Sequence, residues 1–272
     1  MRILRIGMIV AFAAVCVATI MLYLTACDEG EMPVIECSVE QIEAPCNVQN
    51  SELLKYVTAF DAEDGVLTDS IVVESISGFL EKGVSNVTFV VSDNDNHVVK
   101  KTVRLVYSDY RDPVFTSNND LLFYLGERAD VTENIKVRDP IDGDLTGWLI
   151  STSDNFTTDE PGRYMVTYSV TTSKSYTYSI TVPVIVENAE QTLYNIVLSQ
   201  NIAYCKVGAT IDYNSYVDSI QTPYSEGMDY TITADASNVD LSKPGIYDAF
   251  YYAKVGGETV AKTRLIIICE GE

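Results

Sequence analysis

An aspartate pattern that occurs twice carries most of the chemistry that this sequence offers. The pattern D-x-x-D-G-x-L-T stands at residues 61–68 and again at residues 139–146. Carboxylate and main-chain oxygens gathered in one turn are the ligands that Ca²⁺ takes, at about 2.3–2.6 Å. The same residues also form ordinary turns, because an Asp side chain bonds the backbone two residues on and Gly tolerates a positive φ. Turn chemistry is the simpler explanation, and a calcium site is the alternative.

The residue combinations of the common hydrolases and metalloenzymes are missing from the sequence. There is one histidine, His97, and there is no C-x-x-C pair, G-x-S-x-G turn or phosphate-binding glycine loop. Paired carboxylates alone could serve a glycosidase, but here they fall in turns rather than in a visible cleft. We therefore expect no enzymatic activity and no cofactor, and a glycan-active enzyme is the weakest functional hypothesis.

The charge of the chain limits its partners. The formal net charge is −21, and the part after residues 1–27 has 16 basic against 39 acidic residues, a net charge of −23. Such a field repels nucleic-acid phosphates and anionic lipid headgroups. We expect no nucleic-acid partner, and contact with a membrane only through the N-terminal segment.

The N-terminal segment predicts export. Arg2 and Arg5 precede Ile6–Leu24, a run without a charged residue. This run is long for a cleaved signal and nearly long enough to span a bilayer, so a retained anchor is one hypothesis. The other is a lipoprotein, because L-T-A-C resembles the bacterial lipobox and makes Cys27 the acylated residue. In both cases the bulk of the chain lies on the extracellular face of a bacterial membrane.

The repeat predicts an array of small modules. The two copies of the aspartate pattern are 78 residues apart, an offset that indicates a repeated folding unit. We predict the following parts: a signal or anchor segment at 1–27 and modules at 33–107, 114–187 and 194–270. The joints at 108–113 and 188–192 are short and polar, which favours a semi-rigid string.

Alternating side chains predict half-buried β-strands in these modules. In the second module every other residue from Tyr164 to Val170 is apolar, and so is every other residue from Tyr178 to Val186. Pro183 falls among the other alternate residues, which face away from the core. It predicts an edge position there because proline donates no ladder hydrogen bond. Outside the leader no stretch shows a sustained helical period.

A second shared pattern follows the aspartate turn by about 20 residues. A glycine is followed two residues later by tyrosine at Tyr164 and Tyr247, whereas the first module has Ser85. The pattern resembles the tyrosine corner of Greek-key sandwiches, in which the hydroxyl bonds upstream backbone. We expect this corner in the second and third modules and a weaker one in the first.

The aspartate turn, the P-G-x-Y pattern and the alternating strand together resemble the tandem bacterial immunoglobulin-like modules of the DUF5011 type. Such modules occur on Gram-positive surface proteins and are similar to the Ig-like domain of a crystal toxin. The resemblance covers the first two modules, whereas the third keeps K-P-G-I-Y at 243–247 but has Gln221 in place of the first Asp. It implies a β-sandwich and an extracellular setting, and we predict an all-β fold of three tandem Ig-like Greek-key β-sandwich modules after an N-terminal apolar helix. It implies no activity.

The calcium alternative is better supported in the first module. In an Ig-like sandwich the F–G hairpin lies at the same end as the B–C loop, so the acidic segment at 93–96 can meet the first aspartate turn. The candidate ligands are Asp61, Asp64, Asp93 and Asp95. The second module has T-T-S-K at 171–174, which makes a poorer site.

Four cysteines lie beyond the leader and Cys27, and outside the membrane disulfides are plausible. We favour Cys37 with Cys46, which share the first β segment, and Cys205 with Cys269, on the first and last strands of the third module. First and last strands are neighbours in Ig folds. Other pairings, or four free buried thiols, are the alternatives.

The functional hypothesis follows from location and architecture. We predict a membrane-tethered extracellular Ig-like protein that acts as a non-enzymatic structural or adhesive binding module for a surface glycan or protein. We expect ligand contact around Tyr224, in the module farthest from the tether. A sugar platform is also a hypothesis for Trp148, Tyr176, Tyr178, Tyr251 and Tyr252, although packing accounts for most of them. The alternative function is an accessory component of cell-envelope or exopolysaccharide assembly.

Overall fold

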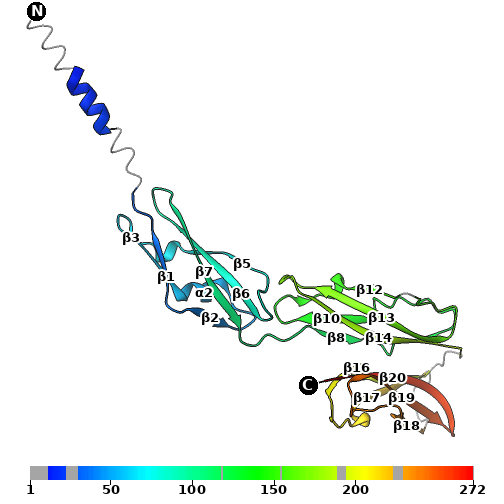
Figure 1. Ribbon diagram of the computed structural model, residues 1–272. Coiled ribbons are helices and arrows are strands. Elements are labelled where there is room, and N and C mark those ends of the chain that lie inside the picture. Colours follow the sequence, from blue (N-terminus) through cyan, green and yellow to red (C-terminus); the bar gives the residue numbers. More distant parts are fainter. Residues whose placement is uncertain are drawn as a thin grey trace, which may run out of the picture. The chain divides into compact units, whose positions relative to one another are not determined.

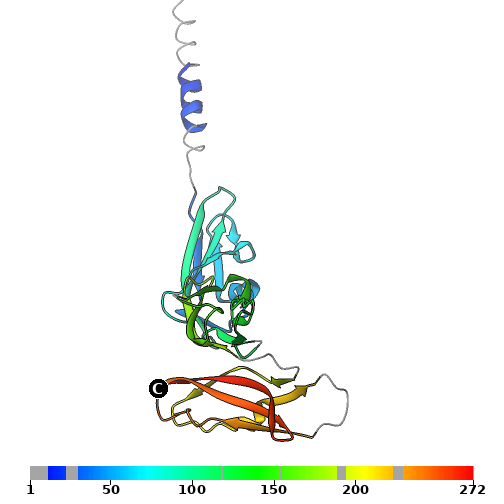
Figure 2. The same ribbon diagram turned by 90° about the vertical axis from the view of Figure 1, so that its right-hand side faces the viewer.

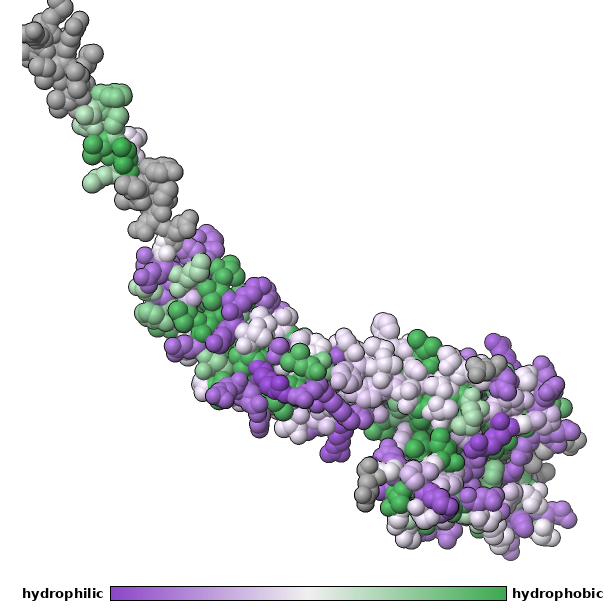
Figure 3. All heavy atoms as spheres, viewed as in Figure 1, coloured by the Kyte–Doolittle hydropathy of each residue, from purple (hydrophilic) through white to green (hydrophobic). Residues whose placement is uncertain are grey.

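The computed structural model describes residues 12–22, 30–117, 119–153, 155–188, 194–222 and 229–271. Residues 12–22 form an apolar helix whose side chains are exposed, as for Phe12 (Figure 3). Within the described ranges no helix combines the length and the apolar character needed to cross a membrane. Cys27, the predicted lipidation site, lies outside the described residues.

Nearly all the rest is β-structure, in two compact units at 1–109 and 110–272 (Figure 1). The strands of the first unit are β1 (Val34–Cys37), β2 (Gln41–Ala44), β3 (Val57–Asp61), β4 (Gly65–Val66), β5 (Val72–Ile76), β6 (Val84–Ser92) and β7 (Val98–Tyr107). Its short helical turns are α2 (Asn50–Leu53), η1 (Leu54–Tyr56) and η2 (Thr68–Ser70).

The first unit holds two sheets, with strand orders β1-β3-β4 and β2-β7-β6-β5. β1 pairs antiparallel with β3, whereas β2, three residues further on, pairs parallel with β7 in the other sheet. The first strand is therefore divided between the sheets. Alternate residues of β6 face the core, with Val87, Phe89 and Val91 fully buried, as the sequence pattern predicts.

The second unit contains two further pairs of sheets. The strands of the second pair are β8 (Val114–Ser117), β9 (Leu122–Tyr124), β10 (Ile135–Asp139), β11 (Gly143–Asp144), β12 (Ile150–Thr152), β13 (Gly162–Thr171) and β14 (Thr177–Glu187). The strands of the third pair are β15 (Asn195–Leu198), β16 (Ile202–Lys206), β17 (Val217–Gln221), β18 (Tyr230–Asp235), β19 (Gly245–Val255) and β20 (Glu258–Glu270). Their short helical turns are η3 (Thr146–Trp148) and η4 (Tyr213–Tyr216).

Both later pairs repeat the strand order of the first unit. The sheets are β11-β10-β8 with β12-β13-β14-β9, and β15-β17 with β16-β20-β19-β18. β9 and β16 pair parallel with the last strand of their own pair, as β2 does. In the described residues no short strand follows β17 in the place of β4 and β11, in keeping with the loss of D-G after Gln221.

The tyrosine corner is confirmed. Tyr164 donates to the Glu160 oxygen at 2.8 Å, and Tyr247 donates to the Lys243 oxygen at 3.0 Å. The glycine of the pattern has a packing reason, since a Cβ on Gly245 would stand 3.0 Å from the Tyr247 hydroxyl. In the first unit Ser85 is buried and its hydroxyl has no hydrogen-bond partner.

A second tyrosine on the same strands bonds the segment that connects the two sheets of its pair. Tyr168 and Tyr251 are fully buried and donate to the main-chain oxygens of Val131 and Tyr213 at 2.8 and 2.9 Å. The sequence pattern marked these positions as core but did not predict the bonds. Phe89 holds the equivalent place in the first unit.

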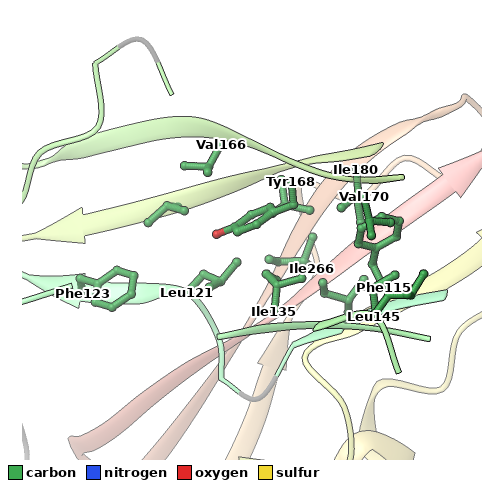
Figure 4. Packing of buried hydrophobic residues seen from close by; sticks show 14 of the residues in the cluster. Phe115, Leu121, Phe123, Ile135, Leu145, Val166, Tyr168, Val170, Ile180 and Ile266 are labelled. Carbon is green, nitrogen blue, oxygen red and sulfur yellow. The ribbon is translucent and has the colours of Figure 1, made fainter. Parts of the chain in front are cut away.

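The hydrophobic core of the second sheet pair extends to residues of the third pair, which also has a core of its own. Figure 4 shows Ile266 of β20 among Ile135, Tyr168 and other core residues of the second pair, and Ile202 of β16 belongs to the same cluster. Ile266 lies on the outward set of β20, yet it is fully buried because the second pair covers it. We expected a string of modules, but these two lie side by side (Figures 1 and 2).

Pro183 lies at an edge of β14 that the third sheet pair covers. It pairs with Met165 of β13, but the ladder with β9 begins only at Ile185. β14 therefore has an edge at this point, as the proline predicts. The edge is buried rather than exposed, because Arg264 of β20 donates to the Pro183 oxygen at 2.9 Å.

Candidate functional site

Each aspartate pattern closes a hairpin, β3–β4 or β10–β11. The first Asp is the last residue of its strand. Its Oδ1 accepts from the N–H groups two and three residues on, at 2.8 and 2.9 Å for Asp61 and at 2.7 and 2.8 Å for Asp139. The glycines that follow have φ of +78° and +75°. The closing threonine bonds back, with Thr68 Oγ1 accepting from Ala59 N at 3.1 Å. Turn chemistry therefore accounts for these atoms.

The second Asp of each pattern holds a neighbouring hairpin. Asp64 Oδ2 accepts from Asn94 N at 2.8 Å, and its Oδ1 accepts from the Asn94 side chain at 2.5 Å. Asp142 does the same with Ser173, whose N and Oγ lie at 2.7 and 2.5 Å. The predicted convergence of the aspartate turn with the hairpin is thus found in both copies.

The predicted calcium ligands of the first unit divide between different partners. Asp93 accepts from His97 N and pairs with His97 Nδ1, both at 2.7 Å. Asp95 lies instead near Glu63, because the Oδ2 of Asp95 and the Oε2 of Glu63 both approach Gly30. No group of three or more His, Cys, Asp or Glu side chains is arranged as a metal site within the described residues. The four-aspartate site stays a prediction.

The predicted disulfide partners of the third sheet pair are adjacent. Cys205 and Cys269 are Cα partners on the parallel strands β16 and β20, and both thiols are free in the structure. Burial, and then the hydrogen bond with Cys269, raise the pKa of the Cys205 thiol. Cys37 ends β1 and Cys46 follows β2, and Cys37 also has a free thiol. Both disulfides stay predictions.

The aromatic residues considered as a sugar platform do not share a surface. Tyr251 is fully buried, so that part of the hypothesis is wrong. Tyr178 bonds the Tyr110 hydroxyl at 2.9 Å and packs against Tyr176, with ring centroids 6.2 Å apart. Trp148 is 75% exposed in η3. Tyr224, where we expected ligand contact, lies outside the described residues.

No motif or spacing in the sequence predicted the polar contacts between the second and third sheet pairs. Arg264, fully buried, donates to the main-chain oxygens of Asp120, Leu121 and Pro183 at 2.7–3.0 Å. Its Nη1 also lies 3.3 Å from Asp248 Oδ1. One guanidinium therefore donates to three carbonyls that lie next to the point where the β9–β14 ladder begins.

Further polar contacts surround this arginine. Thr263 donates to Asp120 at 2.9 Å, and Tyr204 donates to the Phe115 oxygen at 3.0 Å. Lys262 pairs with Glu187. Buried, charge-assisted hydrogen bonds of this kind fix one geometry, because leaving any member unpaired is costly.

A polar cleft opens beside these contacts. The larger cavity, about 250 Å³, is lined from both sheet pairs by Asp120, Leu122, Tyr124, Glu127, Tyr194, Asn195 and Lys262. A smaller cavity of about 100 Å³ shares Asp120 and Asn195 with it and adds Asn119, Asn201 and Thr263. Burial raises the pKa of Asp120 and of Tyr124. Amide, carboxylate and hydroxyl groups in one cleft can donate to and accept from a polar ligand.

Comparisons with known proteins give partial matches. No protein-family profile matches the chain. An uncharacterized 81.3 kDa protein of Acholeplasma phage L2 is 30% identical over 171 residues, which is 61% of this chain and 22% of the phage protein. Pesticidal crystal protein Cry22Aa of Bacillus thuringiensis is 31% identical over 126 residues, or 43% of this chain and 16% of the crystal protein. The chain thus spans about a fifth of the length of these relatives.

Among solved structures, the M60 catalytic domain with the CBM51-1 and CBM51-2 domains of Clostridium perfringens ZmpB is 15% identical. That alignment covers 87% of this chain and 42% of the other, with a TM-score of 0.28.

Proposed function

We propose that this protein is a bacterial surface protein in which three Ig-like Greek-key sandwich modules are held outside the membrane by residues 1–27. The modules act as a non-enzymatic structural or adhesive binding module, and their ligand is a surface glycan or protein. The sequence supports the location through the charged and then apolar leader. The repeated strand order supports the module count, because each sheet pair divides its first strand in the same way.

The observation that carries the binding role is the joining of the second and third sheet pairs around Arg264. Two sandwiches locked by buried hydrogen bonds hold the walls of the polar cleft in a fixed relation. A preformed cleft loses less conformational freedom when it binds than loops that must order first. Tyr124 and Tyr194 supply ring faces, and Asn195 and Glu127 supply polar groups suited to hydroxyls.

The location and the binding are tested separately on the full chain. Protease treatment of intact cells should digest the modules if they are extracellular, and protection of the modules would contradict the tethered location. The purified chain should then bind members of glycan or surface-protein arrays. Failure to bind any member would contradict the binding role.

The cleft is tested with matched variants. Asn195→Ala and Tyr124→Ala should weaken binding to an array ligand by about tenfold, the loss of roughly one good contact. Asn214→Ala, an exposed asparagine of η4 outside both cavities, is the control and should leave binding unchanged. Equal binding by all three variants would place the ligand elsewhere on the chain.

A further inference from the structure

Three charged side chains line the larger polar cleft, namely Asp120, Glu127 and Lys262. The charge of Lys262 is balanced within the protein, because its ammonium pairs with Glu187 and lies 4.6 Å from the centroid of the Phe250 ring. A ligand that enters the cleft therefore meets a cation that is already bound. The charge open to a ligand is that of one of the two carboxylates.

Asp120 is held by its own neighbours. Its Oδ1 accepts from Leu122 N at 3.2 Å, and its Oδ2 accepts from Thr263 Oγ1 at 2.9 Å. Burial raises the pKa of Asp120, while the bond from Thr263 and the charge of Arg264 oppose that shift. This carboxylate thus belongs to the contacts that join the two sheet pairs.

Glu127 is a carboxylate without a basic partner in the described parts of the chain. The turn after β9 holds it in place, because its Oε2 accepts from Tyr124 N and its own N donates to the Tyr124 oxygen, both at 2.9 Å. Gly126 permits this turn with a φ of +78°, and its N donates to the Thr158 oxygen at 2.8 Å. The other carboxylate oxygen, Oε1, accepts no hydrogen bond from the described residues.

The field around the Tyr124 hydroxyl is negative. Burial raises the pKa of this phenol, and the charges of Asp120, Glu187 and Glu127 raise it further. All three are carboxylates. The hydroxyl itself makes no hydrogen bond to a residue that the structure describes. A positive group placed near this hydroxyl and Glu127 is therefore favoured, because opposite charges at short range stabilise each other.

A neutral polar group also lines the cleft. The Asn195 side chain, exposed at the start of β15, makes no hydrogen bond within the described residues. Its amide can donate and accept, and so can the phenol of Tyr124. A ring with several hydroxyl groups can use both, and the aromatic ring offers it an apolar face. An alkyl ammonium such as a lysine side chain would leave the amide unused, because its stem has no polar atom.

We propose that the cleft binds an amino sugar whose amine is unsubstituted and positively charged. This inference rests on the proposed binding role of the cleft and narrows its ligand to one chemical class. The ligand ammonium donates to Glu127 Oε1, and the ring hydroxyls bond Asn195 and the Tyr124 hydroxyl. The cavity of about 250 Å³ lies just below the usual range for ligand pockets, about 300–1,000 Å³, which suits one sugar residue.

The test compares two disaccharides that differ only at their amines, one of glucosamine and one of N-acetylglucosamine. Binding to the full chain in mild detergent is measured by titration calorimetry at about pH 6, where an amine is charged and a carboxylate is ionised. Salt at about 0.15 M screens the general attraction between an acidic chain and a cation. The glucosamine disaccharide should bind at least about tenfold more tightly, the effect of one charged contact.

Matched variants assign this preference to one residue. Glu127→Gln keeps an acceptor for Tyr124 N but removes the charge, so it should weaken binding of the glucosamine disaccharide by about tenfold and leave the acetylated one unchanged. Glu133→Gln makes the same change of charge at an exposed residue outside both cavities. It is the control and should bind both disaccharides as the parent does.

Four results would overturn the amino-sugar assignment. They are no binding of the glucosamine disaccharide up to about 10 mM, tenfold above a millimolar dissociation constant; equal binding of the two disaccharides; a preference that survives Glu127→Gln; and an equal loss in Glu133→Gln. Nα-acetyl-lysine amide that binds as tightly as the glucosamine disaccharide would also overturn it, in favour of a protein ligand.

These outcomes are distinct from failure of the binding role. A chain that binds other members of the arrays and shows one of these results keeps its binding role and loses only the amino sugar as ligand. A chain that binds no array member and neither disaccharide loses both.

Discussion

Arg264 Nη2 lies 2.9 Å from the main-chain oxygen of Pro183, and this contact joins two sheet pairs at the point where a β-ladder is interrupted. A proline at this position ends the ladder on one side of β14 because it has no N–H to donate. The carbonyl groups left unpaired along this edge would be costly to bury without a hydrogen-bond donor. A guanidinium, with five donors in a fixed fork, can serve several carbonyls at once.

Replacing Arg264 by Met should therefore destabilise the second unit strongly. The substitution removes the arginine donor from the buried carbonyls of Asp120 and Pro183 and leaves the Leu121 carbonyl with Ile185 N alone. Asp248 also loses one of its two arginine partners. We expect the free energy of unfolding to fall by about 3–5 kcal/mol, as for a broken buried ion pair. Urea unfolding followed by circular dichroism measures the change.

Arg163 provides the matched control for this prediction. It also pairs with Asp248, at 3.2 Å, but its side chain is 46% exposed. Arg163→Met should cost no more than about 1 kcal/mol because exposed ion pairs contribute little. Similar losses for the two variants would mean that Arg264 does not hold the sheet pairs together.

The second Asp of the repeated pattern should contribute to the free energy of unfolding through its hydrogen bonds to the adjoining hairpin. Asp142→Ala removes the acceptor for Ser173 N and Ser173 Oγ. We expect a loss of about 1–3 kcal/mol in the free energy of unfolding, the usual range for removing an acceptor of charge-assisted hydrogen bonds. Hydrogen exchange should quicken at residues 172–176 and not in β9.

Asp144 is a neighbouring aspartate with a different role. It accepts from Thr146 N at 2.9 Å and makes no bond to the β13–β14 hairpin in the described structure. Asp144→Ala should leave exchange in that hairpin unchanged. Faster hydrogen exchange at residues 172–176 in both variants would show that any disturbance of the turn loosens the hairpin, whichever aspartate is removed.

The sequence predicted what depends on local pattern. Period-two alternation identified the buried faces of β6, β13 and β20, and the G-x-Y spacing identified the corner hydroxyls of Tyr164 and Tyr247. These features follow from a few neighbouring residues, because pleat and turn geometry are local. The convergence of turn and hairpin was also predictable, since loop ends are fixed by the fold of a sandwich.

The docking of the third sheet pair was not predictable in this way. Arg264 and Ile266 fall on the outward set of β20, where alternation normally places solvent-facing residues. Their own strand does not show which residues cover them, because those residues lie about 80–140 positions away in the chain. A long apolar side chain on the outward set was the one available sign of a covered face.

Acid should weaken the first unit through Asp93. Burial raises the pKa of this carboxyl, but the bonds from the main chain and ring of His97 outweigh that effect and hold the pKa below its ordinary 3.8. A lowered pKa means that the stabilisation is present above the unfolded-state pKa and is lost as pH falls through the lower, folded-state pKa. The contribution of the Asp93 charge should therefore disappear below about pH 3.8.

The variant Asp93→Asn isolates this charge while it keeps a side-chain acceptor. At pH 5 the variant should melt below the parent, and the difference between the two melting temperatures should close as the pH is lowered toward 2. Thermal melts at half-unit steps of pH measure the difference. A gap that is the same at pH 5 and at pH 2 would show that the charge of Asp93 contributes nothing.

In the third sheet pair, Cys205 and Cys269 stand opposite each other on β16 and β20. Neighbouring strand positions bring Cα atoms within the range that a disulfide spans. The link would close a loop of about 64 residues and stabilise the fold by about 4 kcal/mol in the chain-entropy model. The raised pKa of the Cys205 thiol leaves little thiolate at neutral pH, so the bond should form slowly without a catalyst.

We expect peptide mapping of the exported protein, without reductant, to find Cys205 joined to Cys269 and Cys37 joined to Cys46. Cys269→Ser should lower the melting temperature under oxidising conditions, whereas in the presence of dithiothreitol the difference from the parent should shrink to the cost of placing serine at this buried site. The reductant comparison separates the covalent link from packing, because the serine change perturbs the buried site equally in both conditions. Alkylation of all four thiols in the native exported protein, or a bond between the first and third sheet pairs, would disprove the assignment.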